Sequence, residues 1–256
     1  MKLSRLFIIA FLVMSTAALG QLDTDADFKR TVYKNETTGG VIFHTRGYGA
    51  NLRRQYYKDG YNKNGWEIDL VNIRHPKEVK FPNQLIFNPS RSFVDGKINS
   101  LYSIRFGYGN EKILVDKTDQ GSVSIAWTIY GGLSLGILKP IYLEVLQDGQ
   151  ISVERYDPEV HPYSTIYGQA SFFTGIGNSS LNPGLYIKSG FNFDYNLIDE
   201  KITTLETGVI FDFFPTYNPS TPSGLFSEGV PIMYNTKNYN LWLQFYVTFN
   251  FGSKWN

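Results

Sequence analysis

Residues 241–251 carry the pattern that decides the fold: Leu-Trp-Leu-Gln-Phe-Tyr-Val-Thr-Phe-Asn-Phe. Every second residue from Leu241 to Phe251 is apolar, and the residues between them are mostly polar. A period of two residues is typical of a β-strand, in which successive side chains point to opposite faces. The alternation covers 11 residues. That is longer than an average strand of about five or six residues, and it matches the about 9–11 residues with which a tilted strand crosses a bilayer.

The same alternation recurs upstream. We expect strands near residues 41–57, 64–75, 98–110, 121–137, 139–147, 183–195, 201–213 and 240–251. An even number of antiparallel strands with one apolar face is characteristic of bacterial membrane barrels. The predicted fold class is therefore all-β: an antiparallel up-and-down transmembrane β-barrel of eight strands, with ten as the alternative.

The connections of such a barrel alternate between its two ends. With a periplasmic N-terminus, the outer connections are expected near residues 58–63, 111–120, 148–182 and 214–239, and the inner ones near 76–97, 138–139 and 196–200. Inner turns are short in barrels of this kind, so 76–97 does not fit. Either this segment folds back under the barrel or the strand count is off by one hairpin.

Residues 1–20 are expected to be a cleaved secretory signal peptide. Two basic residues precede the apolar run Leu6–Met14, and small residues before Gln21 fit a cleavage site. The run is shorter than the about 20 residues of a membrane-spanning helix. Residues 21–256 contain no internal repeat, and we expect them to form a single outer-membrane β-barrel domain.

Composition narrows the function classes. The 256 residues include 19 Phe, 18 Tyr and 4 Trp, but only 18% are charged, against roughly 25% in an average chain. This apolar content excludes disorder, and the absence of cysteine excludes a disulfide scaffold and a thiolate metal site. The 24 basic residues are balanced by 23 acidic ones, which argues against a nucleic-acid partner.

Charged residues recur in mid-strand on the face opposite the apolar row. In a membrane barrel they would face inward and must pair, because an unpaired buried charge costs several kcal/mol. Both signs are present, and the expected lumen charge network is Arg46, Glu67, Asp69, Arg105, Lys188, Glu206 and Asp212. The residues expected in aromatic girdles at the membrane interfaces are Trp66, Trp127 and Trp242.

Several short motifs resemble those of an uncharacterised family of outer-membrane β-barrel proteins from Bacteroidota-type Gram-negative bacteria. They are Gly47-Tyr48-Gly49, Glu67-Ile68-Asp69-Leu70-Val71, His75-Pro76-Lys77-Glu78, Arg91-Ser92-Phe93-Val94, Gly96-Lys97, Gly132-Leu133-Ser134-Leu135-Gly136, Lys139-Pro140 and Tyr156-Asp157-Pro158 with His161. The resemblance spans roughly residues 40–195. It implies an outer-membrane location and a barrel fold, and it implies no activity.

Two motifs have both a catalytic and a structural interpretation. His75-Pro76-Lys77-Glu78 would supply a base oriented by Glu78, or it marks a strand end at a membrane interface, where proline stops the ladder. Glu67 and Asp69 share a face and would form an acid/base pair, or they belong to the lumen network. We favour the structural interpretation of both.

Three further segments are open to a binding role. His44, His75 and His161 could build a metal site, although their spacing matches no metal motif. Asn51-Leu52-Arg53-Arg54 could touch lipopolysaccharide phosphates, or it is an ordinary solvated loop end. Residues 164–181 permit a short amphipathic helix at the barrel mouth, with a loop packed on the rim as the alternative.

The favoured function is that of an integral outer-membrane barrel without catalytic activity, whose narrow lumen is filled by side chains. Its role would be in envelope integrity, in surface contact or as a subunit of an outer-membrane complex. No cofactor or metal is expected. The expected partners are outer-membrane lipids and lipopolysaccharide, with other outer-membrane proteins as further candidates.

Two alternatives remain open. The first is an outer-membrane enzyme that modifies acyl chains of lipid A or phospholipids, with His44 or His161 as base and Ser164 as nucleophile. His44-Thr45-Arg46 departs from the His-x-Ser-Asn signature of the barrel lipid A deacylases. The second is a soluble exported β-barrel that binds an apolar ligand, which requires the apolar faces to point inward.

Overall fold

The computed structural model describes residues 33–83, 91–117, 122–147, 149–195, 200–216 and 229–256. The predicted signal peptide lies outside these residues. Residues Val32–Asn256 form one compact unit. Within the described part of the chain, no helix is long and apolar enough to cross a membrane.

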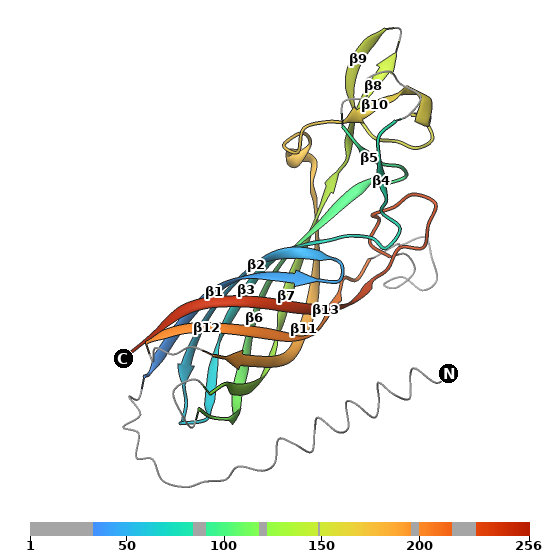
Figure 1. Ribbon diagram of the computed structural model, residues 1–256. Helices are drawn as coiled ribbons and strands as arrows, with labels where there is room; N and C mark the ends of the chain where they lie inside the picture. The colour runs from blue at the N-terminus through green and yellow to red at the C-terminus, as the bar shows by residue number, and fades with distance from the viewer. Residues whose placement is uncertain (1–32, 84–90, 118–121, 148, 196–199, 217–228) are drawn as a thin grey trace, which may run out of the picture. The chain divides into compact units, whose positions relative to one another are not determined.

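Eight antiparallel strands close into a barrel in the order β1-β13-β12-β11-β7-β6-β3-β2 (Figure 1). Sequence neighbours pair with each other, and the last strand pairs with the first, so the barrel is of the up-and-down type that the sequence predicts. The strands are β1 (Asn35–His44), β2 (Gly47–Tyr57), β3 (Asn62–Ile73), β6 (Asn99–Val115), β7 (Ser124–Pro140), β11 (Ser180–Asp194), β12 (Lys201–Phe213) and β13 (Leu241–Trp255).

The alternation of residue types sets which face of each strand is covered. On β13 the apolar row from Leu241 to Phe251 lies on the outer face, and the row from Gln244 to Asn250 is buried inside the barrel. The other barrel strands follow the same rule, with exposed apolar side chains outside and polar side chains buried within. The barrel is therefore apolar on its outer wall, and its interior holds the buried polar and charged side chains together with apolar residues such as Ile42 and Trp242.

Two of the eight predicted strands are wrong. One of them is in fact two barrel strands and the other lies outside the barrel, so the predicted total of eight barrel strands is still correct. The predicted strand 41–57 is two strands, β1 and β2, joined by the two-residue turn Thr45-Arg46. Gly47 begins β2 so close to β3 that a Cβ atom there would lie 2.3 Å from the carbonyl oxygen of Asn72. A side chain does not fit in that gap, so the start of β2 requires a glycine beside β3.

The predicted barrel strand 139–147 leaves the barrel. Its residues form β8 (Tyr142–Gln147), which pairs with β9 (Gln150–Arg155) and β10 (Ile166–Gln169) in a separate three-stranded sheet. This sheet has its own apolar core with Phe93 of the hairpin strand β5 (Phe93–Val94), which pairs with β4 (Lys80–Phe81). Alternation continues from β7 into β8 because both strands bury one face, although they bury it in different sheets.

Because of these two errors, the sequence prediction also assigns several connections to the wrong end of the barrel. Residues 58–61, 116–123 and 195–200 connect strands at the end of the barrel where β1 begins and β13 ends, which we call the terminal end. The longer segments 74–98, 141–179 and 214–240 connect strands at the opposite end, which we call the long-loop end. The predicted placement of 58–63 and 111–120 with the outer loops, and of 76–97 with the inner turns, is therefore wrong.

The long-loop end is closed by an apolar cluster. Val230, Ile232 and Met233 pack with barrel residues such as Ile42 and Trp242 and are at most 5% exposed. The amide groups of Ile98 and Asn99 both donate to the carbonyl oxygen of Ile232, at 3.0 and 3.2 Å. The chain between β12 and β13 therefore folds back over the interior.

Of the two alternatives for residues 164–181, the short amphipathic helix does not form. The structure has a short 3-10 turn at Tyr163–Thr165, strand β10 and a second 3-10 turn at Ile176–Asn178. The apolar side chains of Phe172 and Phe173 are 54% and 77% exposed.

Candidate functional site: the charged lumen

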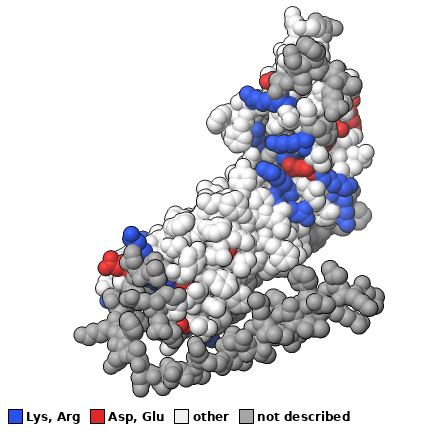
Figure 2. Space-filling model, viewed as in Figure 1, with Lys and Arg blue, Asp and Glu red and all other residues white. Residues whose placement is uncertain are grey.

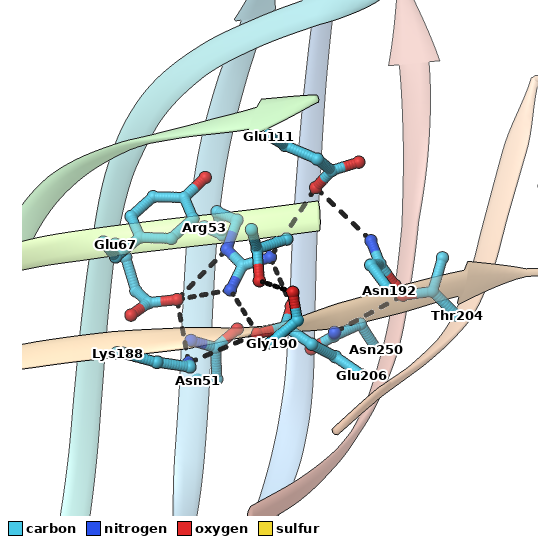
Figure 3. Close-up of polar contacts among 12 residues, drawn as sticks. Asn51, Arg53, Glu67, Glu111, Lys188, Gly190, Asn192, Thr204, Glu206 and Asn250 are labelled. Carbon is cyan, nitrogen blue, oxygen red and sulfur yellow. Dashed lines mark hydrogen bonds and ion pairs between the residues drawn. The ribbon is translucent and has the colours of Figure 1, made fainter. Parts of the chain in front are cut away.

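The interior of the barrel holds a continuous network of ion pairs (Figure 3). Inward positions on β1, β2, β3, β6, β11 and β12 supply its charged side chains, because every second residue of a strand faces the interior. These side chains are nearly all inaccessible to solvent. The network has three connected groups along the barrel axis.

Arg53 of β2 is at the centre. Its guanidinium Nη2 lies 2.5 Å from Oε2 of Glu67, and its Nη1 lies 2.6 Å from Oε2 of Glu206. The Tyr130 ring lies beneath it, 4.4 Å from the guanidinium carbon. Lys188 of β11 completes the group, with Nζ 2.9 Å from the same oxygen of Glu67. Two cations thus share one carboxylate.

The group nearest the terminal end is organised by Lys63. Its Nζ lies 2.9 Å from Glu111 and 3.1 Å from Glu36. Gln55 and Asn192 also donate hydrogen bonds to Glu111, at 3.1 and 3.3 Å. Glu111 is therefore compensated by charge and by amide donors, and Glu36 by charge and by the hydroxyl group of Tyr57, which donates to it at 3.2 Å.

The group nearest the long-loop end is a two-pronged pair between Arg105 and Asp212. Nε and Nη2 of Arg105 donate to the two carboxylate oxygens at 2.8 and 2.6 Å. Asp69 joins this group to the centre, since it lies 3.6 Å from Arg105 and 3.4 Å from Lys188. Asn51 donates a further hydrogen bond to Asp69.

Each of the four bases contacts at least two carboxylates. The network contains Arg53, Lys63, Arg105 and Lys188 against Glu36, Glu67, Asp69, Glu111, Glu206 and Asp212. Four positive and six negative groups give a formal charge of −2 (4 − 6). Loss of any base would leave two carboxylates undercompensated in an interior without water contact, which is costly.

The structure brings six of the seven predicted network residues together: Glu67, Asp69, Arg105, Lys188, Glu206 and Asp212. Arg46 lies apart from them, half-buried in the turn between β1 and β2, where its carbonyl oxygen accepts the amide of Arg74 at 2.8 Å. The turn shifts the inward parity from even residues on β1 to odd residues on β2, so Arg46 does not continue the row of Ile42 and His44.

The sequence prediction missed four members of the network: Glu36, Arg53, Lys63 and Glu111. The sequence leaves two placements open for Arg53, a contact with lipopolysaccharide phosphates or a solvated loop end, and both are wrong because Arg53 is 2% exposed inside the barrel. The alternation of β2 could have shown that Arg53 faces inward. Asn51, Arg53 and Gln55 form one polar row, and Leu52 and Arg54 lie on the opposite face.

Two of the three predicted girdle tryptophans face outward. Trp66 is 48% exposed and stacks on Phe106, with ring centroids 5.3 Å apart, and Trp127 is 41% exposed. Trp242 is a correction: it is 2% exposed and lies inside, on the same face of β13 as Gln244. Trp242 faces inward because of its position in the alternation of β13, and its being a tryptophan does not change this.

The imidazole of His75 is not oriented by Glu78. Its Nε2 lies 3.1 Å from the carbonyl oxygen of Lys237, and its ring stacks against Tyr239. The Glu78 carboxylate instead accepts the backbone amide of His75 at 2.9 Å and pairs with Lys97 at 2.6 Å. The motif follows the end of β3 and ties two loop segments together.

The remaining histidines also have local partners. Nε2 of His161 lies 3.0 Å from Glu154, and its Nδ1 accepts the amide of Asp157 at 3.1 Å. Ser164 is exposed in the neighbouring 3-10 turn, and its hydroxyl group is not a hydrogen-bond partner of either ring nitrogen of His161. His44 is buried at the end of β1. Within the described ranges, no group of three or more His, Asp or Glu side chains is arranged to hold a metal ion.

Comparisons with known proteins give no family for this chain: no family model matches it, and no curated protein matches it. Among solved structures, the chain is similar to Ail, the attachment invasion locus protein of Yersinia pestis, with a TM-score of 0.39 and 8% identity over 87% of this chain and 99% of that one. It is also similar to Neisserial surface protein A, with a TM-score of 0.37 and 11% identity over 87% of this chain and 96% of that one.

Proposed function

We propose that this chain is an integral outer-membrane β-barrel without catalytic activity, whose lumen is closed by side chains. Its role is in envelope integrity, in surface contact or as a subunit of an outer-membrane complex. Removal of residues 1–20 on export, a single mature domain over residues 21–256 and kinship with the Bacteroidota-type family belong to the same proposal.

The observation that carries the proposal is the arrangement of apolar and charged residues on the closed barrel. Large apolar side chains are 40–60% exposed on the outer wall, including Phe43, Leu52, Leu70, Phe106 and Phe245. The network carboxylates and bases, by contrast, are at most 7% exposed inside. Water would favour the reverse arrangement, whereas a hydrocarbon solvent favours this one.

The same arrangement argues against a soluble barrel that holds an apolar ligand, because such a barrel needs its apolar faces inside. The filled lumen also argues against a general pore. Eight strands leave an interior just wide enough for side chains, and here the network and the apolar cluster around Ile232 occupy it. The paired state of Glu67 and Asp69 supports a structural role for both.

Membrane partition tests the proposal. The full-length chain is expressed in a Gram-negative host, and membranes are washed with alkaline carbonate and then extracted with detergent. We expect the chain in the detergent fraction, with a folded form that migrates differently from the boiled form on a gel. A chain that stays in solution without detergent would contradict the proposal.

A further inference from the structure

A cavity of about 570 Å³ lies at the long-loop end of the barrel, between the ends of β3 and β6 and the hairpin of β4 and β5. One side is the outer wall, with Tyr48, Leu70 and Ile104, and the other side carries the cations Arg74, Lys80 and Lys97. The charged lumen does not contribute to this cavity. It is therefore a second site with a different chemistry.

The apolar side of the cavity continues the outer wall of the barrel. Leu70 of β3 and Ile104 of β6 are direct cross-strand neighbours, 52% and 37% exposed. Trp66, Ile68 and Leu70 form one outward row along β3. An acyl chain that lies along this row reaches the cavity without leaving apolar surface.

The polar side begins where that row ends. Arg74 follows Asn72 and Leu70 at the end of β3, and its guanidinium carbon lies 5.7 Å from the Tyr48 ring centroid. Arg74 and Lys80 are both exposed. Figure 2 shows Lys and Arg side chains gathered beside the largely uncharged barrel wall.

The cations of this cavity outnumber its carboxylates. Glu78 is the one acidic residue that lines it, and its carboxylate is paired with Lys97 at 2.6 Å. Burial lowers the pKa of Lys97, Glu78 opposes this effect, and the charges of Lys80 and Arg74 lower the pKa further, so both cations lie within electrostatic reach of Lys97. In the part of the chain that the structure describes, neither Arg74 nor Lys80 has a carboxylate partner within 4.0 Å.

Resting on the proposed function, we propose that this cavity binds one phosphorylated lipid of the surrounding leaflet. Its acyl chain lies along Leu70 and Ile104, and its phosphate is held by Arg74 and Lys80. Arginine matches phosphate oxygens with paired donors, and lysine adds a compact charge. Two cations that lack a carboxylate partner complement the charge of about −1.5 to −2 on a phosphomonoester.

Lipid binding to the folded chain tests this proposal. The chain without residues 1–20 is folded in neutral maltoside micelles, and bound lipid is counted by native mass spectrometry during titration with dioleoyl phosphatidic acid or with dioleoylglycerol. We expect one phosphatidic acid per chain and no comparable adduct of dioleoylglycerol. The double variant Arg74→Gln/Lys80→Gln should weaken phosphatidic acid binding by about tenfold or more, since each charge-assisted contact is lost.

The matched control is Lys58→Gln/Lys112→Gln, which removes the same charge from exposed positions at the terminal end. It should bind phosphatidic acid as the wild type does, and equal weakening would show attraction to net charge only and overturn the proposal. Ile104→Ser should weaken phosphatidic acid binding and leave folding intact. Displacement of the lipid by millimolar inorganic phosphate would reveal a free-anion site and overturn it too.

The two proposals fail in different ways. A chain that needs no micelle to stay in solution contradicts the proposed function. A chain that folds in micelles, as shown by a heat-sensitive gel shift, but takes up both lipids equally contradicts only the lipid site.

Discussion

Arg53 and Glu206 are 153 residues apart in the chain, yet Nη1 of Arg53 lies 2.6 Å from Oε2 of Glu206 inside the barrel. The pair links β2 to β12, which are not neighbours in the sheet. Backbone hydrogen bonds hold each strand only to the strands beside it. The side-chain network therefore adds connections across the barrel that the sheet itself lacks.

Loss of Arg53 should destabilise the barrel strongly. Arg53→Met leaves Glu67 and Glu206 short of a base in the interior, and breaking a buried pair in this way costs about 3–5 kcal/mol. The measurement is urea unfolding of the chain in lipid vesicles, followed by tryptophan fluorescence, with the unfolding free energy compared between variant and wild type.

The neighbouring arginine provides the control for this measurement. Arg54 is exposed on the outer face of the same strand, so Arg54→Met should change the unfolding free energy by less than about 1 kcal/mol. A second substitution, Glu206→Met, should restore part of the stability that Arg53→Met removes. Equal effects of Arg53→Met and Arg54→Met would contradict the role given to the network.

The inward position of Arg53 shows which part of the structure local sequence determines. Alternation assigns a side chain to one face of a strand, and it did so correctly for the row from Leu241 to Phe251 and for Glu67 and Asp69. Face assignment depends only on neighbours two residues away, so a single sequence is sufficient for it.

Alternation does not report where one strand ends and the next begins. The turn at Thr45-Arg46 has two residues and none of the Asn-Gly type that favours hairpins, and apolar residues alternate on both sides of it. The close approach that requires a glycine directly after this turn, Gly47 against Asn72, joins residues 25 apart in the chain. The same limit applies at Pro140, where the chain passes from the barrel into the sheet of β8.

Positive charge on the outer wall should oppose membrane insertion. Phe249 lies on the outer face near the middle of β13, next to Val41 and Leu205. An arginine at mid-membrane on such a face costs about 2–4 kcal/mol and near an interface about 0–1 kcal/mol. We expect Phe249→Arg to lower the yield of heat-modifiable folded protein in vesicles.

Ser253 on the same face of β13 is the matched position near the terminal end, and Ser253→Arg should fold as the wild type does. Phe249→Leu separates the effect of charge from that of a lost ring. If Phe249→Arg and Ser253→Arg gave the same folded yield, the outer wall would not face lipid.

Epitopes inserted after two glycines at opposite ends of the barrel would show which end faces the cell exterior. Gly149 lies in the hairpin between β8 and β9, Gly60 lies between β2 and β3, and neither has an atom within 4 Å of an added Cβ. In outer-membrane barrels the longer loops are extracellular. An epitope inserted after Gly149 should therefore bind antibody on intact cells. An epitope after Gly60 should bind antibody only after permeabilisation, and the opposite result would invert the barrel.

Acid should loosen the segment that closes the long-loop end. His75 is held as a neutral ring: its Nε2 donates to the carbonyl oxygen of Lys237 at 3.1 Å, and its Nδ1 accepts the amide of Lys77 at 3.3 Å. Burial lowers the pKa of His75 below its ordinary value. The folded state therefore binds fewer protons than the unfolded state, so the stabilisation is complete above about pH 6.5 and is lost as the pH falls below it.

Hydrogen exchange of peptides from residues 229–240 measures this effect in micelles, after correction for the intrinsic pH dependence of exchange. Wild type should exchange faster at acidic than at neutral pH in this segment, whereas strands of the barrel wall should not change. His75→Phe keeps an aromatic ring against Tyr239 and Trp242 but cannot take up a proton, so its exchange should be nearly independent of pH. A variant that retained the full acid response would show that another group controls the closing segment.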